Sequence, residues 1–189
     1  RAQDAPLSII VPVDPFRGYL SDLARSLGTD RKEISLSRPD LLVIGIHATE
    51  NMIRLHLTPV EVKCRQQDTI FSPNDAREAL GQAQAMSALL AALSERAVGS
   101  ALWELAYKHL LLSMVGFGLR VYSQQEGVAT QAAMWASYHE RVASAILGPG
   151  APISIDPKGR LIVVDGSQSD ARDHDGDGFN ESIFISPRD

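Results

Sequence analysis

The sequence predicts an α/β fold, in which a central sheet is flanked by helices. Two apolar segments typical of strands, 41–46 and 53–64, follow each other in the first third of the chain. Longer segments after them repeat apolar residues at the spacing of a helix. The end of the chain returns to short apolar runs separated by turn residues. We therefore expect an α/β domain over 14–147 and a β-hairpin module over 151–189.

A helix is expected close to the N-terminus, after an extended lead-in over 6–13. Asp14 and Pro15 give an N-cap followed by proline at the first helical position, and Gly28 marks the end of the helix. The segment 41–46 is short and continuously apolar, which is typical of a strand that is covered on both faces. The chain is therefore expected to form a helix first and a buried strand next.

The segment 53–64 is expected to form the following strand, because its first apolar residues occupy every second position. Pro59 cannot donate a hydrogen bond to a neighbouring strand, so it indicates an edge position or a bulge. Ser72 and Asp75 then resemble a capping box at the start of a long helix, which should end near Ala97.

The second half of the chain is expected to contain two more helices, over 100–115 and 130–147. Gly116 and Gly118 should break the first of them, and 119–122 is expected to form a strand.

The C-terminal module is expected to begin with a hairpin. Strands over 153–155 and 160–164 flank the Asp-Pro-Lys-Gly sequence of 156–159, which is a hairpin turn signal. A loop rich in Gly, Ser and Asp should then lead to a last strand over 182–185.

Composition narrows the class of protein. The chain has 189 residues, of which 44% are hydrophobic and 22% charged, as in one soluble globular domain with at most an appendage. No run of about 18 apolar residues is present, so we expect no contact with a membrane. The single cysteine, Cys64, excludes an internal disulfide and fits a reducing, cytoplasmic location. A first residue other than Met indicates a segment of a longer polypeptide or a processed N-terminus.

The net charge of −5 is confined to one segment. Residues 165–189 contain seven acids and two arginines, while the rest of the chain has 16 acids and 16 bases. An acidic protein normally disfavours a polyanionic partner. Here a cation bound to the acidic segment would offset the excess, so DNA stays open as a partner.

Three charged residues are expected to meet at one end of the sheet. Asp40 precedes the buried strand, and Glu61 and Lys63 lie two residues apart on the next strand, so they share one of its faces. If the two strands pair, Asp40 comes close to Glu61. Charges seldom belong in such apolar strands, which favours a functional role.

This trio is suited to phosphodiester hydrolysis. Two carboxylates without thiolates or clustered histidines form a hard oxygen site for Mg²⁺ or Mn²⁺. Such a metal polarises the scissile phosphate and lowers the pKa of a bound water. A lysine beside it would orient that water and offset the charge that builds on the phosphate oxygens.

The sequence Pro39-Asp40, followed by Glu61-Val62-Lys63 in an apolar strand, resembles the PD-(D/E)xK, or restriction endonuclease-like, nuclease superfamily. The resemblance covers about residues 15–98 and implies that Asp40 and Glu61 bind the divalent metal while Lys63 serves the water. Many members carry a glutamine on the following helix, which would be Gln82, with Gln84 as the weaker candidate. Some add an acid from the first helix, for which Asp22 is the candidate.

Two other interpretations of these residues stay open, because the motif is short and chance produces it often. The fold could be nuclease-like but inactive, serving DNA binding or assembly, or the charges could form a surface ion pair. Four bases could contact phosphates or simply form a solvated face: Arg31, Lys32, Arg38 and Arg65.

A more specific resemblance links segments 57–63 and 119–122, with the acidic tail, to the nuclease-like part of large ATPase/helicase proteins. Those proteins serve bacterial phage-defence restriction systems. The resemblance implies a metal-dependent DNA endonuclease within a restriction, defence or repair protein. Expected partners are DNA, the rest of that polypeptide and a second copy of the chain. No G-x-x-x-x-G-K-[ST] loop is present, so the motor would lie elsewhere.

The acidic tail contains a second candidate metal site. Acids occupy relative positions 1, 3, 5 and 9 of a loop: Asp173, Asp175, Asp177 and Glu181. Position 6 is a glycine, Gly178. An EF-hand would need glutamate at position 12, where Phe184 stands. The spacing instead resembles the calcium loops of integrin-type β-propeller repeats. We expect a structural Ca²⁺ that fixes the last strand to 160–164, with a solvated acidic turn as the alternative. An extracellular adhesive repeat is the weaker reading, since only one copy is present.

The remaining polar residues are interpreted as structural. Four histidines show no spacing typical of metal ligands: His47, His56, His109 and His139. Cys64 should face away from Glu61 and Lys63 and is expected to be a buried thiol.

Overall fold

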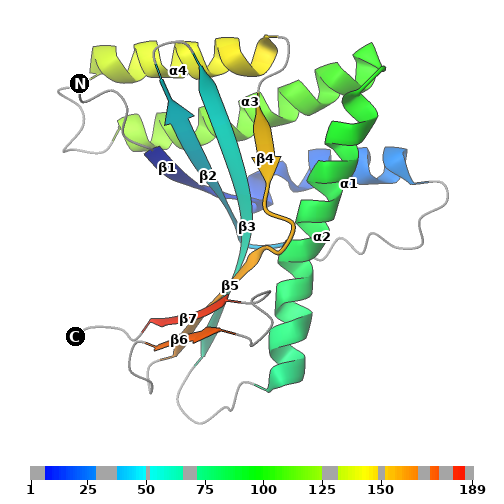
Figure 1. The fold of residues 1–189 in the computed structure, drawn as a ribbon, viewed down its shortest axis with the longest axis vertical. Coiled ribbons are helices and arrows are strands. Elements are labelled where there is room, and N and C mark those ends of the chain that lie inside the picture. The colour runs from blue at the N-terminus through cyan, green and yellow to red at the C-terminus, as the bar shows by residue number, and fades with distance from the viewer. Residues whose placement is uncertain are drawn as a thin grey trace. The chain divides into compact units, whose positions relative to one another are not determined.

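The computed structural model describes residues 7–28, 38–49, 52–65, 72–124, 132–148, 152–165, 171–174 and 181–185. These residues form a mixed α/β structure (Figure 1). Its strands are β1 (Leu7–Pro12), β2 (Leu41–Ala48), β3 (Ile53–Arg65), β4 (Ile153–Ile155), β5 (Arg160–Asp165), β6 (Ala171–His174) and β7 (Glu181–Ile185). Its helices are the 3₁₀ turn η2 (Asp14–Phe16), α1 (Arg17–Leu27), α2 (Pro73–Ala97), α3 (Ala101–Ser123) and α4 (Ala132–Leu147). The predicted α/β class is confirmed.

The strands pair in the order β1-β2-β3-β5-β7-β6, and β4 also pairs with β3. β3 is parallel to β4 and β5, β5 is parallel to β7, and β6 is antiparallel to β7. Parallel neighbours need a long crossover, which α2, α3 and α4 supply between β3 and β4. The predicted pairing of the last strand with 160–164 is confirmed by the register of β5 and β7.

The predicted hairpin between 153–155 and 160–164 is wrong. Both segments pair in parallel with β3, at Leu55–Leu57 and Val60–Arg65, so they run in one direction along it. The turn between them forms, with Lys158 N–H donating to Asp156 Oδ1 at 2.9 Å, but it does not reverse the chain. Pro59 falls between the two paired stretches, so its missing N–H leaves no ladder bond unmade on this side of β3.

The chain divides into two compact units, each assembled from three segments. Unit 1 comprises Arg1–Val11, Val43–Leu57 and Ala91–Ile155. Unit 2 comprises Pro12–Leu42, Thr58–Leu90 and Asp156–Asp189. The domains expected over 14–147 and 151–189 stay a prediction.

Unit 1 is built on α3 and α4, which run side by side (Figure 1). The alternating burial of β3 confirms the predicted pattern, with apolar residues inward and Arg54 and His56 exposed. Its fully buried side chains include Ile9, Ile44, Ile46, Leu57, Leu93, Leu110, Leu111, Met114 and Leu119. Among the described helices, none is long and apolar enough to cross a membrane.

Helix α3 continues through the two glycines that were predicted to end it, so the strand expected over 119–122 is wrong. A Cβ on Gly118 would lie 2.8 Å from Ile9 Cδ1 and 2.9 Å from Val11 Cγ2. The glycine therefore lets β1 pack directly on the helix, and this tertiary contact outweighs its poor intrinsic helix propensity.

Unit 2 contains α1, the first part of α2 and the strands β5, β6 and β7. The predicted capping box of α2 is confirmed: Asp75 N–H donates to Ser72 Oγ at 3.1 Å, and Ser72 N–H donates to Asp75 Oδ2 at 3.3 Å. The first helix buries Leu20, Leu23 and Ala24. A buried cluster joins α2 to β5 and consists of Ala79, Leu80, Leu161 and Val163.

Candidate functional site

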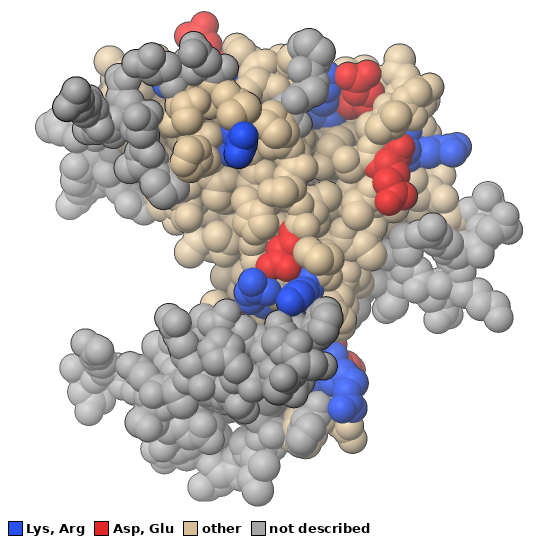
Figure 2. Space-filling view, viewed as in Figure 1, with Lys and Arg blue, Asp and Glu red and all other residues tan. Residues whose placement is uncertain are grey.

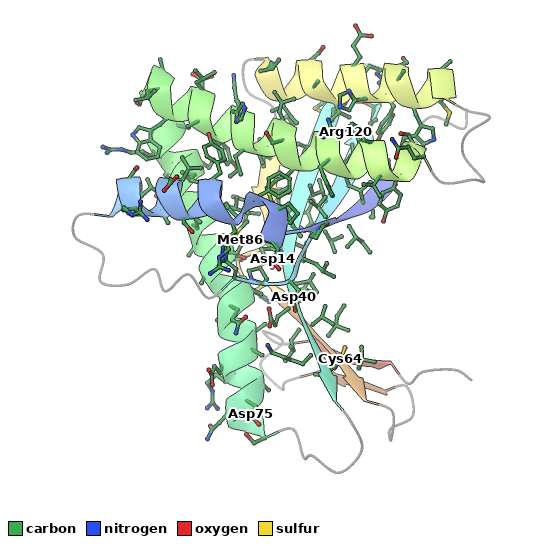
Figure 3. All side chains as sticks on the ribbon, turned by 180° about the vertical axis from the view of Figure 1, so that it is seen from behind. Asp14, Asp40, Cys64, Asp75, Met86 and Arg120 are labelled. Carbon is green, nitrogen blue, oxygen red and sulfur yellow. The ribbon has the colours of Figure 1, made fainter. Side chains whose placement is uncertain are left out.

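Asp40 is held at the beginning of β2 by two backbone hydrogen bonds. Its carbonyl oxygen accepts from Val13 N–H at 3.0 Å, which joins it to the segment before α1. Its carboxylate Oδ2 accepts from Val62 N–H at 2.9 Å, which joins it to β3. The preceding Pro39 is buried and the Asp40 side chain is exposed, so the loop is fixed while its carboxylate meets solvent. Figure 3 shows Asp14 and Asp40 in this region.

Glu61 lies on the inward face of β3 and is only 1% exposed. It is in register with Leu161 of β5, and Lys63 is in register with Val163. Because Leu161 and Val163 pack against α2, Glu61 and Lys63 face the same helix. The charge and the backbone of Asp40 both influence the pKa of Glu61, so the two residues lie near each other as predicted.

Lys63 forms an ion pair with Glu61, with 2.6 Å between Nζ and Oε1. The Lys63 side chain is 39% exposed, whereas that of Glu61 is 2% exposed. The ammonium therefore neutralises a buried carboxylate from the solvent side, which reduces the cost of burying that charge.

Gln82 reaches the same carboxylate from α2. With the amide oriented by its hydrogen-bond network, its nitrogen lies 3.0 and 3.1 Å from the two Glu61 carboxylate oxygens. The same nitrogen lies 3.1 Å from the Arg38 carbonyl oxygen. Gln82 thus joins Glu61 to the loop before β2, while the alternative candidate, Gln84, is exposed. The structure brings Asp40, Glu61, Lys63 and Gln82 together.

The pKa of Glu61 is raised above its ordinary value, first of all by burial. The negative charge of Asp40 raises it further, while the hydrogen bond and charge of Lys63 and the Asp40 backbone lower it. Burial therefore raises the pKa of Glu61 by more than Lys63 lowers it, so ionising this carboxylate costs free energy in the folded chain. A second positive charge beside Glu61 would relieve that cost.

We expect the stability of the protein to depend on pH through Glu61. An acid with a raised pKa contributes stability that is fully present below its ordinary pKa, 4.5, and is lost as the pH rises through the raised value. The replacement Glu61→Gln, which stays neutral, should therefore gain stability relative to wild type as the pH rises from 4 to 8. Urea denaturation across this range measures the difference.

Glu104→Gln is the matched control, because Glu104 also pairs with a lysine, at 2.7 Å from Lys108, but is half exposed. Its stability difference from wild type should change much less over the same pH range. A constant difference for Glu61→Gln as well would contradict the raised pKa.

Asp22, the acid expected from the first helix, does not join the site. It forms an ion pair with Arg25 on the same helix, at 3.1 Å, and both side chains are at least 70% exposed. Cys64 is also exposed, so the expectation of a buried thiol is wrong. It is the last described side chain of β3, beyond the packed cluster.

The sequence indicated Arg38 only as one of four bases that could contact phosphates, and it did not assign the neighbouring Arg17 and Asp14 to the site. Burial, and next the positive charge of Arg17, lower the pKa of Arg38, while the charge of Asp14 raises it. Arg38 directly precedes the Pro39-Asp40 pair, which was the available signal. Arg31 and Lys32 lie outside the described residues, and the side chain of Arg65 is not described.

The acidic loop lies largely outside the described part of the chain. Asp175 and Asp177 belong to the undescribed segment 175–180, and only the backbone of Asp173 and Glu181 is described. β6 and β7 pair antiparallel around that segment, with His174 opposite Glu181. The Ca²⁺ site stays a prediction.

The described donors fit a hard divalent cation at Asp40 and Glu61. Mg²⁺ is usually held by one or two carboxylates together with water and substrate phosphates, and here two carboxylates lie close enough for one to raise the pKa of the other. Within the described ranges, no group of three or more His, Cys, Asp and Glu residues gathers.

Comparison with protein-family models, curated proteins and solved structures found no match.

Proposed function

We propose that this chain is a metal-dependent DNA endonuclease domain with a restriction endonuclease-like core, which hydrolyses phosphodiester bonds. The observation that supports it most is that three residues meet at Glu61: Asp40 before β2, Lys63 on β3 and Gln82 on α2. The order of α1, β2, β3 and α2 along the chain agrees with the order expected for such a core.

Asp40 and Glu61 would hold Mg²⁺ or Mn²⁺, which supplies polarisation of the scissile phosphate and a water of lowered pKa. Lys63 is partly exposed and keeps its ammonium next to the Glu61 carboxylate, where it would orient the attacking water and offset charge on the phosphate oxygens. Gln82 is a positioning residue, because its amide fixes the Glu61 carboxylate against the Arg38 carbonyl.

Nicking of supercoiled plasmid tests the proposed function. We expect wild type to nick in Mg²⁺ or Mn²⁺ but not in EDTA, and Lys63→Ala to be slower by about 10²–10³-fold, as when one transition-state stabiliser is lost. Lys108→Ala is the matched control, since it removes a lysine that pairs with Glu104, and should nick at the wild-type rate. Equal nicking by wild type and Lys63→Ala would contradict catalysis at this site.

A nuclease-like module without activity is the second candidate. The observation in its favour is that Lys63 and Gln82 already engage the oxygens of Glu61, so the carboxylate has polar partners without a metal. This module would bind DNA or a protein with an affinity that is the same in Mg²⁺ and in EDTA. Binding that strengthens with Mg²⁺ in wild type but not in Asp40→Asn would exclude it.

We also propose that the chain is part of a larger cytoplasmic bacterial protein of restriction, defence or repair, with an ATPase/helicase motor elsewhere. The support is the resemblance of segments 57–63 and 119–122, of which the second forms the end of α3 rather than a strand. An immunoblot of the source cells tests this proposal. A band no larger than that of a 189-residue chain would contradict it.

For the acidic loop we propose a structural Ca²⁺ bound by Asp173, Asp175, Asp177 and Glu181. The antiparallel pairing of β6 and β7 supports it, because it brings the two ends of the loop together. Ca²⁺ should raise the melting temperature of wild type but not of Asp175→Asn/Asp177→Asn. An equal effect on both proteins would contradict it.

A further inference from the structure

We propose that Arg38 forms a phosphate-binding site beside the Asp40 and Glu61 carboxylates. This site would receive the DNA backbone phosphate next to the scissile phosphate. The inference rests on the proposed function, since it assigns a part of the substrate to this site. Its basis is a guanidinium group whose hydrogen bonds are incomplete.

The Arg38 guanidinium has buried donors without acceptors. Its Nε and Nη1 atoms are buried and have no hydrogen-bond partner among the described residues. Nearly all buried polar groups in proteins are hydrogen-bonded, and a buried donor without an acceptor is costly. A group kept in this state points to an acceptor that arrives with a ligand.

The backbone of Arg38 is fixed relative to the carboxylates. Its carbonyl oxygen lies 3.1 Å from the Gln82 amide nitrogen, which also lies within 3.1 Å of both Glu61 carboxylate oxygens. The residue before a proline is restricted to extended conformations, and Pro39 itself is buried. Only Pro39 lies between Arg38 and Asp40, so their Cα atoms are at most about 7 Å apart.

The chemistry of the group matches a phosphate. A guanidinium is a planar fork of donors that binds two oxygens of a phosphate at once. The charge of Arg17 also acts on Arg38, and Asp14 offsets it in part. On the face shown in Figure 2, described basic and acidic side chains are scattered rather than gathered in a basic band.

DNA binding without cleavage tests the inference. A fluorescently labelled duplex is titrated with protein in EDTA, at KCl concentrations from about 50 to 200 mM, where phosphate contacts determine the salt dependence. Arg38→Met keeps the volume of the side chain and removes its charge. We expect its affinity to fall about tenfold, since hydrogen bonds to a charged group are lost. The slope of log affinity against log salt should fall by about one.

Arg25→Met is the matched control, because Arg25 is an exposed arginine of α1 that pairs with Asp22. It should keep the wild-type affinity and slope. Arg38→Lys keeps the charge but loses the fork, so it should bind with intermediate affinity and the wild-type slope. Equal behaviour of Arg38→Met and Arg25→Met would overturn the inference.

Two further readouts separate a ligand site from a structural one. Arg38→Met should melt at or above the wild-type temperature, because it removes two buried donors that have no acceptor. A clearly lower melting temperature would reveal a structural partner and overturn the inference. If inorganic phosphate stabilises wild type but not Arg38→Met, while both bind DNA equally, the ligand is free phosphate and the DNA assignment fails. Neither result depends on cleavage, so Mg²⁺-dependent nicking by wild type would still support the proposed function.

Discussion

Replacing Asp40 with asparagine is expected to lower the rate of plasmid nicking by about 10³-fold, at the upper end of what loss of one electrostatic stabiliser costs. Asparagine has the same shape, and its carbonyl oxygen can still accept the hydrogen bond that Val62 N–H donates to Asp40 at 2.9 Å. The variant therefore removes the charge that would hold a cation while it keeps the link between the loop and β3. Initial nicking rates in Mg²⁺ measure the effect.

The control for this variant is Asp22→Asn, which neutralises an exposed acid of α1 that pairs with Arg25. It should nick at the wild-type rate. Both variants should melt within a few degrees of wild type, which shows that lost activity is not lost folding. Unchanged nicking by Asp40→Asn would remove Asp40 from the reaction.

The second large effect is expected at Gly159, in the turn that precedes β5. Its φ is +65°, a left-handed conformation that costs other residues about 1 kcal/mol or more. A Cβ there would lie 2.6 Å from Ala83 Cβ and 3.1 Å from the Ala83 carbonyl carbon, so α2 or the turn must move. We expect Gly159→Ala to lower the free energy of unfolding by about 2–4 kcal/mol, as strain and overpacking add.

Gly99→Ala separates the two contributions. Gly99 also has a left-handed conformation, with φ of +81°, but nothing lies within 4 Å of a Cβ at that position. It should therefore lose only about 1 kcal/mol, from backbone strain. Urea denaturation of both variants gives the difference, and similar losses would show that the contact with Ala83 is not tight.

The position of the site was predictable because one period continues along β3. Ile53, Leu55 and Leu57 place every second residue inward, and the same period places Glu61 and Lys63 on that face. The sequence could therefore reveal that charged residues lie on a face of the strand that is otherwise apolar. Gln82 was implied by the resemblance to the nuclease superfamily, and helical spacing agrees with it, since Met86, four residues later, is buried.

The remaining features depend on contacts between distant segments. The turn at 156–159 was correctly placed, but only pairing with β3 determines that β4 and β5 do not pair with each other. Gly116 and Gly118 disfavour a helix locally, whereas the approach of β1 to Gly118 is a tertiary contact. In the same way, tertiary packing buries the Arg38 donors, and the sequence alone shows only that a basic residue is present.

The most direct test of the central claim is a calorimetric titration of Mn²⁺ into wild type and Asp40→Asn at pH 8, where Glu61 is ionised more fully than at lower pH. Because the acidic tail can also bind cations, the comparison between the two proteins is decisive. We expect wild type to show a binding event that Asp40→Asn lacks or shows at least about tenfold more weakly, the size of loss seen even for residues that only support metal ligands. Identical titrations would contradict a cation site formed by Asp40 and Glu61.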